Sequence, residues 1–165
     1  MRHIISILLQ NEAGALARVS ALFSSRGYNI ESLSVAPTEH VELSRVTLVT
    51  IGSDDVIEQI IKQLGKLVDV VKIADMTLSD HIERELLLIK LQVDKGKAQR
   101  MEEIIEGNEV RVLDDTAENF TLELTGTTEE VDDFIADVSG CAEILAVVRS
   151  GAMAVSRGDQ SLRNR

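Results

Sequence analysis

The chain has 165 residues, of which 44% are hydrophobic and only 2% are aromatic, so its core must be packed from aliphatic side chains. A formal net charge of −11 argues against nucleic acid and anionic membrane surfaces as partners, and the scarcity of aromatic residues argues against base stacking. Residues 1–76 carry 7 Lys+Arg against 9 Asp+Glu, whereas residues 77–165 carry 10 against 19. This uneven distribution predicts two units with different surfaces.

The cysteine content and the length of the apolar runs indicate the cellular compartment of the protein. Cys141 is the only cysteine, so the sequence has no internal disulfide framework, and its apolar neighbours favour a buried, inert thiol. The apolar run at residues 4–9 is too short for a signal peptide, and no run approaches the length needed to span a bilayer. We therefore expect a soluble, cytoplasmic protein.

Residues 1–76 contain the pattern strand, helix, strand, strand, helix, strand. Short β-branched runs predict the strands, and apolar residues that recur along one face predict the helices. Gly27 ends the first helix in a left-handed conformation, and Ser53 is the N-cap of the second. The expected strands are residues 3–9, 29–37, 43–51 and 68–73, and the helices occupy residues 16–26 and 54–64.

The same order repeats in residues 77–165. The expected strands are residues 86–93, 110–113, 120–125 and 142–148, and the first helix of this half covers residues 97–106. Thr127-Thr128-Glu129-Glu130 matches a capping box at the start of the second helix. The polar residues 114–119 are expected to form a hairpin loop, and the aperiodic tail from Ser150 is expected to be mobile toward its end.

A repeated β-α-β-β-α-β order predicts an α+β protein of two tandem ferredoxin-like units, each an antiparallel sheet with its helices on one face. We place the units at residues 1–76 and 77–165. In the strand order 4-1-3-2 expected for this topology, the second strand of the first unit is an open edge, which proteins usually cover or pair. Pairing it with the same strand of a second copy gives a two-fold homodimer.

No catalytic or metal-binding pattern stands out in the sequence. His3, His40 and His81 are far apart and lack metal-ligand spacing, and there is no phosphate loop, nucleophile elbow or Cys-x-x-Cys pair. Asp114 and Asp115 are interpreted as a solvated hairpin tip rather than a cation site, because no oxygen-ligand loop surrounds them. We expect no catalytic residue and no bound metal in this chain.

The turn Asn11–Leu16 is the candidate binding site. It leads from a strand into a helix, so free backbone N–H groups and the positive end of the helix dipole face outward, as in sites for small anions such as carboxylates. Gly14 allows a ligand to approach the backbone closely, and the N–H groups of Gly14, Ala15 and Leu16 are the expected donors. Taken alone, the pattern Asn-x-x-Gly-x-Leu is also that of an ordinary turn.

A dimer paired through its second strand brings Tyr28, Asn29 and Ile30 of one chain near this turn of the other. The side-chain amides of Asn11 and Asn29 can then hold the carboxylate and ammonium of an amino acid. Ala13 and Ala36 are expected to face the aliphatic side chain of the ligand. Selectivity between similar aliphatic amino acids should be modest, because one methylene changes the binding free energy by about 1–3 kcal/mol. The residues therefore predict an amino-acid sensor, with the ordinary-turn interpretation still open.

The sequence resembles a known family over essentially the whole chain. Four segments carry the resemblance: residues 4–19, 23–38, 63–70 and 149–151. The run Arg26-Gly27-Tyr28-Asn29-Ile30-Glu31-Ser32-Leu33 is highly specific. These segments resemble the small, regulatory subunit of acetolactate synthase, whose first unit is an ACT domain. The resemblance implies a non-catalytic subunit that binds and activates the thiamine-diphosphate-dependent large subunit. It also implies feedback inhibition by valine in the biosynthesis of valine, isoleucine and leucine.

The resemblance further implies valine at an ACT–ACT interface of a homodimer. The positions that match this site are Asn11, Ala13, Gly14, Ala15, Leu16, Asn29 and Ile30. Valine is the implied effector, no cofactor is expected in this chain, and thiamine diphosphate, Mg and FAD are expected only on the large subunit. Three alternatives stay open: an ACT-type sensor for another amino acid or effector, a purely structural assembly subunit, and an enzyme on a ferredoxin-like fold.

Overall fold

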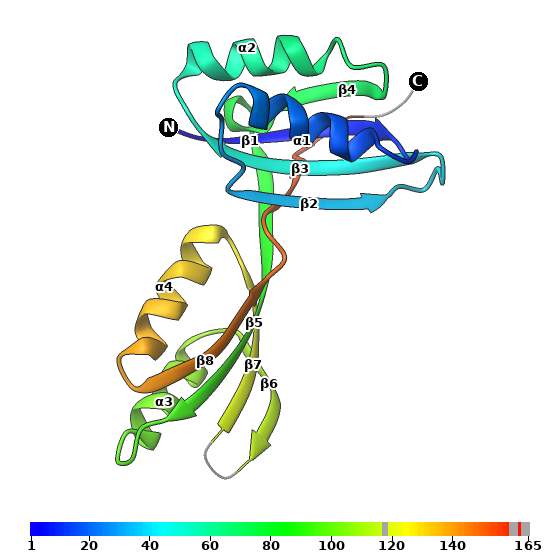
Figure 1. Cartoon of the computed structure of the whole chain (residues 1–165). Coiled ribbons are helices and arrows are strands. Elements are labelled where there is room, and N and C mark those ends of the chain that lie inside the picture. The colour runs from blue at the N-terminus through cyan, green and yellow to red at the C-terminus, as the bar shows by residue number, and fades with distance from the viewer. Residues whose placement is uncertain (117–118, 159–161, 163–165) are drawn as a thin grey trace. The chain divides into compact units, whose positions relative to one another are not determined.

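The computed structural model describes residues 1–116, 119–158 and 162. The chain divides into two compact units (Figure 1): Met1–Ile82 and the chain from Ala152 onward form the first, and Glu83–Gly151 form the second. Both units have the α+β architecture that the repeated order predicts. No helix within the described residues is long and apolar enough to cross a membrane.

The first unit is built on a four-stranded antiparallel sheet with the strand order β2-β3-β1-β4. Its elements are β1 Arg2–Gln10, α1 Ala15–Ser25, β2 Ser32–Pro37, β3 Leu43–Ile51, α2 Asp54–Leu64, β4 Val70–Asp75, the 3-10 helix η1 Met76–Leu78 and β9 Met153–Ser156. The expected 4-1-3-2 order is confirmed, with β2 at the edge. β2 begins later than expected because Tyr28 still donates its N–H to the Phe23 carbonyl at 3.0 Å and so belongs to the end of α1.

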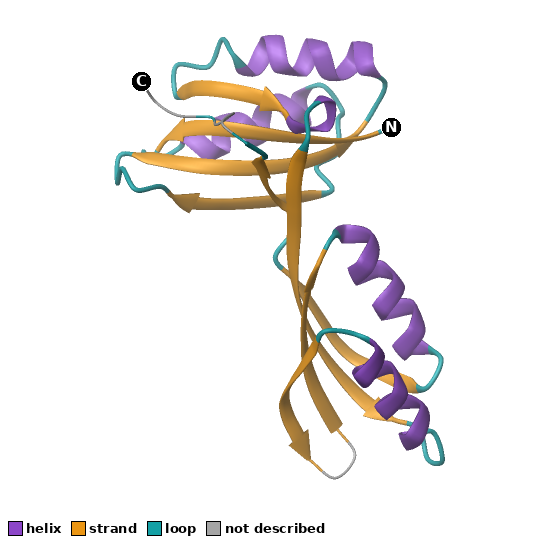
Figure 2. Cartoon of the chain, turned by 180° about the vertical axis from the view of Figure 1, so that it is seen from behind, coloured by secondary structure: helices purple, strands orange, loops and turns teal. Residues whose placement is uncertain are grey.

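Both helices of the first unit pack on the same face of this sheet (Figure 2). The alternation of side chains along β1 puts Ile5, Ile7 and Leu9 on the helix side. The buried members of this core are Ile5, Ile7, Leu9, Ala15, Val19, Phe23, Val46, Leu48, Ile57, Ile60 and Leu64. Phe23 is the one aromatic residue among them, as the low aromatic content leads one to expect.

The second unit repeats the topology with the strand order β6-β7-β5-β8. Its elements are β5 His81–Val93, which starts within the first unit, α3 Ala98–Gly107, β6 Val110–Thr116, β7 Asn119–Gly126, α4 Thr128–Ser139 and β8 Ala142–Arg149. The capping box at the start of α4 is confirmed. The Glu130 N–H donates to Thr127 Oγ1 at 3.2 Å, and the Thr127 N–H donates to Glu130 Oε2 at 2.7 Å.

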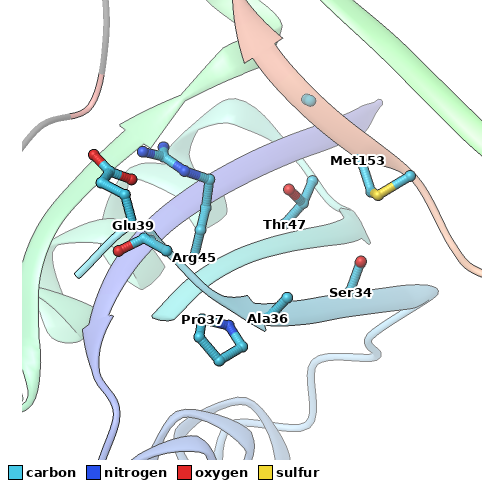
Figure 3. Close-up of a pocket in the computed structure, with 9 residues that line it drawn as sticks. Ser34, Ala36, Pro37, Glu39, Arg45, Thr47 and Met153 are labelled. Atoms are coloured by element: carbon cyan, nitrogen blue, oxygen red, sulfur yellow. The ribbon is translucent and has the colours of Figure 1, made fainter. Parts of the chain in front are cut away.

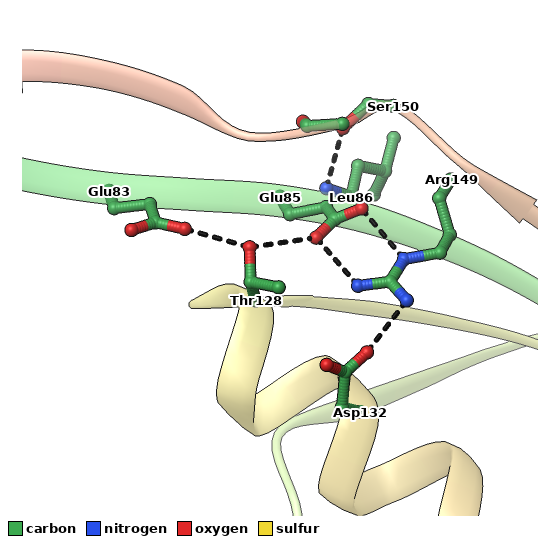
Figure 4. A network of polar contacts seen from close by, with 8 residues as sticks. Glu83, Glu85, Leu86, Thr128, Asp132, Arg149 and Ser150 are labelled. Carbon is green, nitrogen blue, oxygen red and sulfur yellow. Dashed lines mark hydrogen bonds and ion pairs between the residues drawn. The ribbon is translucent and has the colours of Figure 1, made fainter. Parts of the chain in front are cut away.

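An ion-pair network fastens α4 to β5 and β8 (Figure 4). Arg149 donates Nε and Nη2 to the two carboxylate oxygens of Glu85 at 2.8 and 2.9 Å, and Nη1 to Asp132 Oδ1 at 2.7 Å. These carboxylates raise the pKa of Arg149, with Glu85 contributing most. Thr128 at the start of α4 donates its Oγ1 to Glu83 at 2.7 Å. The network therefore fixes the first turn of α4 relative to both strands.

The segment expected to be a polar hairpin loop is mostly strand. β6 continues to Thr116, where Asp114 pairs with Thr121 and Asp115 pairs with Phe120, so the two aspartates are not a hairpin tip. Aspartate has a low strand propensity, which made the sequence pattern misleading, but pairing with β7 outweighs that preference while both carboxylates remain exposed. The remainder of the expected loop, at residues 117–118, lies outside the described residues.

The C-terminal segment differs from the predicted domain division, which assigned all of residues 77–165 to the second unit. β9 belongs to the first unit, and Ala152 and Ala154 pack with Ile4 and Val49 on the sheet face that the helices leave open. A strand of only four residues is too short to show a period, so this packing could not be recognised in the sequence. The expected mobile end of the tail falls mainly on residues outside the described part of the chain.

Candidate functional site

The turn between β1 and α1 is a helix start with free donors. Gly14 is the N-cap residue and has a φ of +85°, a left-handed conformation that favours glycine, and no side chain caps the helix. The Ala15 N–H already donates to the Glu12 carbonyl at 3.2 Å. Among the described residues, no backbone carbonyl outside the helices and strands accepts a hydrogen bond from the N–H of Gly14 or from the N–H of Leu16. Two of the three expected donors therefore remain for an anion.

The predicted residues of the turn differ in how they can reach a ligand. Asn11, Ala13 and Gly14 are exposed, and Leu16 is half-buried. The Ala15 side chain is 1% exposed and belongs to the core of the first unit. Ala15 therefore anchors the helix start, while its neighbours form the accessible surface.

Asn11 joins the turn to the loop between β2 and β3. Its backbone N–H donates to the Glu42 carbonyl at 2.8 Å, and its Nδ2 donates to the Val41 carbonyl at 2.8 Å. The side-chain oxygen of Asn11 accepts no hydrogen bond from the described residues. Asn11 is thus a turn residue in this chain, and the group it can offer a ligand directly is an acceptor.

A cation lies beside Gly14. A Cβ added to Gly14 would come within 2.9 Å of Nη1 of Arg18. Arg18 is held by a bidentate ion pair with Asp69, whose side chain is 6% exposed. Hydrogen bonding within this pair raises the pKa of Arg18 and lowers the pKa of Asp69. Both groups therefore stay charged at neutral pH next to the helix start.

Asn29 and Ile30 lie at the other end of α1, a helix of 11 residues and hence about 16 Å long at 1.5 Å per residue. Asn29 donates its Nδ2 to Glu31 Oε1 at 2.7 Å, and its carbonyl accepts from Thr50 Oγ1 at 2.6 Å. Ile30 is half-buried against the core. Within one chain, Asn29 and Ile30 are therefore not brought to the turn.

The edge strand β2 leaves its outer side open. Within the described part of the chain it pairs with β3 alone, and Val35, Ala36 and Pro37 are exposed. Val35 pairs with Val46, which belongs to the helix-side core, so Ala36 and its partner Arg45 lie on the opposite face. Ala36 therefore does not face the turn of its own chain.

No group of three potential metal ligands occurs among the residues that the structure describes. His3 is buried, and its ring nitrogens lie 3.4 Å from Asp54 and 3.6 Å from Asp75 without forming hydrogen bonds. Cys141 is buried as predicted, and burial raises the pKa of its thiol. An unreactive thiol is the consequence.

Sequence reasoning missed four residues that surround the predicted site: Arg18, Glu31, Val41 and Asp69. The spacing of four residues between Gly14 and Arg18 was the available signal, because such residues are neighbours on a helix. The bond from Asn11 to Val41 spans 30 residues and the pair of Arg18 with Asp69 spans 51, so no local pattern indicates them.

Comparisons with known protein families match both units. Residues 5–72 match the model of the AHAS small subunit-like ACT domain. Residues 84–158 match the model of the small subunit of acetolactate synthase. The matches cover the turn, β2 and most of the second unit.

Comparisons with individual proteins give matches along the whole chain. The chain is 46% identical over 166 residues to the acetolactate synthase isozyme 3 small subunit of Escherichia coli (strain K12), with 99% of this chain and 100% of that protein covered. It is 44% identical over 165 residues to the acetolactate synthase small subunit of Haemophilus influenzae, covering 98% and 99%. The crystal structure of the acetolactate synthase small subunit from Thermotoga maritima matches with a TM-score of 0.84 at 33% identity, covering 97% and 99%.

Proposed function

The chain belongs to the family of acetolactate synthase small subunits, and we propose that it binds the catalytic large subunit, raises its activity and makes that activity sensitive to valine. Members of this family are regulatory, non-catalytic subunits. The proposal places the chain in feedback control of valine, isoleucine and leucine biosynthesis. It assigns effector sensing to the first unit and leaves thiamine diphosphate, Mg and FAD to the large subunit.

The helix start at Gly14 is the observation that carries the proposal. Its uncapped N–H groups and the helix dipole favour an anion, and a carboxylate is the anion that every amino acid carries. The guanidinium of Arg18 beside Gly14 adds positive potential at the same end of α1. The turn is thus suited to the carboxylate of valine.

A second copy of the chain supplies the remaining residues in this proposal. Asn11 follows Gln10, which pairs with Leu43 at one end of the sheet, whereas Asn29 lies at the end where β2 begins. Antiparallel pairing of two β2 edges about a two-fold axis places the start of one β2 beside the end of the other. Asn29 and Ile30 of one chain then approach the turn of the second chain, whereas within one chain they lie at the opposite end of α1 from it.

The groups around such a two-chain site also suit an ammonium. The side-chain oxygen of Asn11 is an unused acceptor in the described structure, and Glu31 already accepts from Asn29 at 2.7 Å. An ammonium group can bind these oxygens while the carboxylate binds the helix start. Ala13 and Ile30 then provide apolar surface for the side chain of valine.

Valine can inhibit only by binding two arrangements of the assembly with different affinities. A tenfold coupling corresponds to about 1.4 kcal/mol, which one charged hydrogen bond gained in a single state supplies. A site divided between two chains meets this condition, because a change in the distance between the chains alters both halves of the site.

A sensor for another amino acid is the second candidate. The carboxylate and ammonium that all amino acids share would be bound by Asn11, Gly14 and Asn29. Only the apolar residues Ala13 and Ile30 discriminate between side chains, by about 1–3 kcal/mol per methylene. Calorimetric titration with valine, leucine, isoleucine and serine separates the two candidates.

Reconstitution with the large subunit tests the proposal. Synthase activity is measured for the large subunit alone, with this chain, and with this chain and valine. We expect activation on adding the chain and inhibition on adding valine. Activation without a valine response would leave only an assembly role, and turnover by the isolated chain would show an enzyme instead.

A further inference from the structure

A pocket of about 280 Å³ lies on the face of the first sheet that α1 and α2 do not cover (Figure 3). It is lined by Ser34, Ala36, Pro37, Thr38, Glu39, Arg45, Thr47, Met153 and Ala154. This volume is close to the lower limit of about 300 Å³ for small-molecule sites, so the pocket suits a ligand of amino-acid size. None of its lining residues belongs to the turn Asn11–Leu16.

Arg45 supplies the positive charge of this pocket. Its Nη2 donates to the Leu162 carbonyl at 2.6 Å, which is a neutral acceptor. No carboxylate pairs with Arg45 in the part of the chain that the structure describes. The guanidinium has a planar fork of donors that matches a carboxylate, and the donors not used by Leu162 are available for one.

Glu39 supplies a negative charge to the same pocket. It is exposed and forms no ion pair with the described residues. Figure 3 shows the charged groups of Arg45 and Glu39 at one end of the pocket. A ligand with a carboxylate alone would be repelled by Glu39, whereas one with a carboxylate and an ammonium on the same carbon complements both residues.

The other end of the pocket is apolar but contains unused hydroxyls. Met153 and Thr47 lie toward this end in Figure 3. Thr47 is 4% exposed, and neither Thr47 nor Ser34 has a side-chain hydrogen bond among the described residues. The Thr47 and Ser34 hydroxyls line the pocket and can therefore hydrogen-bond to a ligand that enters it.

We propose that this pocket binds a small aliphatic α-amino acid, separately from the turn at the start of α1. Arg45 binds the carboxylate, Glu39 binds the ammonium, and the aliphatic side chain lies between Ala36 and Met153. Since Met153 is in β9, an occupied pocket also holds the C-terminal segment against the sheet. The chain then has two amino-acid sites with different chemistry.

Methionine-methyl NMR on the full chain tests this site directly. The chain contains 4 methionines. Met153 lines the pocket, whereas Met101 is buried in the core of the second unit and serves as an internal control. With L-valine as the probe, we expect the Met153 signal, assigned with Met153→Leu, to shift while the signal of Met101 stays in place. Isovalerate should bind more weakly, and isobutylamine, which has no carboxylate, should bind weakest.

Two variants decide the outcome. Arg45→Gln should weaken the Met153 response by at least about tenfold, the loss expected for one charged hydrogen bond. Ala36→Leu, which fills the pocket, should do the same, whereas Ala21→Leu on the exposed side of α1 should not. Asn29→Ala should leave the response unchanged. A Met153 signal that does not move with valine, or that moves equally in Arg45→Gln, would overturn the proposal.

Discussion

Arg18 in α1 donates Nε to Oδ2 of Asp69 at 2.6 Å and Nη2 to Oδ1 at 2.8 Å, so residues 51 apart in sequence form a bidentate pair. The backbone carbonyl of Asp69 also accepts the Gln10 N–H at 2.8 Å. The start of α1 and the end of β1 are therefore both tied to the residue that precedes β4. This arrangement fixes the two ends of the candidate binding turn.

Replacing Asp69 by Asn should destabilise the fold mainly above acidic pH. The hydrogen bond from Arg18 lowers the pKa of Asp69 below its ordinary value of 3.8. A carboxyl with a depressed folded-state pKa stabilises the protein above its unfolded pKa, and this contribution is lost as the pH falls through the folded pKa. Urea unfolding of wild type and Asp69→Asn should thus differ at neutral pH and converge in acid.

A control for this measurement is Glu58→Gln, which removes an exposed i,i+4 pair with Lys62. Such pairs contribute little to stability, so this variant should resemble the wild type at every pH. A difference between wild type and Asp69→Asn that does not change with pH would show that the ionised pair is not the source of the effect.

Gly14→Asp should abolish valine inhibition while leaving activation of the large subunit intact. The new carboxylate repels that of the ligand, and its Cβ would come within 2.9 Å of Nη1 of Arg18. A residue with a Cβ also lowers the stability of the fold by about 1–2 kcal/mol when it is held at a φ of +85°. Gly96→Asp is the matched control, because Gly96 has a φ of +87° with nothing within 4 Å of an added Cβ. Wild-type valine sensitivity in Gly14→Asp would remove the turn from the site.

Asn29→Ala should weaken valine binding by about tenfold, the value of one hydrogen bond to a charged group. Calorimetric titration of the isolated chain measures this loss. Gln99→Ala, which removes an exposed amide in α3, should bind valine like the wild type. Equal affinities for wild type and Asn29→Ala would exclude Asn29 as a ligand.

Mixed dimers distinguish a shared site from two sites within single chains. When Gly14→Asp chains are mixed with Asn29→Ala chains, each mixed dimer contains one site with both substitutions and one with neither. We therefore expect the mixture to regain part of the valine sensitivity that is abolished in Gly14→Asp and reduced in Asn29→Ala. Sites built within one chain would show no such recovery in reconstituted synthase assays.

Arg149→Met should lower the free energy of unfolding by about 3–5 kcal/mol, because it leaves the Glu85 carboxylate buried without a counter-ion. The side chain of Glu85 is 4% exposed. The double variant Glu85→Leu/Arg149→Met should recover most of this loss in urea titrations. Arg157→Met breaks a pair with Asp80 whose side chains are 57% and 81% exposed, and it should cost less than about 1 kcal/mol. Additive losses in the double variant would contradict the pairing.

Local pattern was enough to predict most of the fold. The β-α-β-β-α-β order, the left-handed Gly27 after α1 and the box at Thr127–Glu130 all depend on residues a few positions apart. Ser53 occupies the N-cap position of α2 as predicted, but its side chain forms no capping hydrogen bond. The errors occur where a distant partner overrides local preference. Asp114 and Asp115 become strand because β7 pairs with them, and β9 joins the first unit because Ala152 and Ala154 pack against Ile4 and Val49.

The sequence by itself determined the two ferredoxin-like units, the aliphatic core and the position of the turn Asn11–Leu16. These features depend on periodicity, helix caps and turns, which are set by residues close together in the sequence. Only the tertiary structure decided what surrounds that turn. It shows Arg18 held by Asp69, Asn11 bound to the loop at Val41, and Asn29 at the far end of α1. Such contacts join segments that are distant along the chain, and only folding brings them within hydrogen-bonding distance.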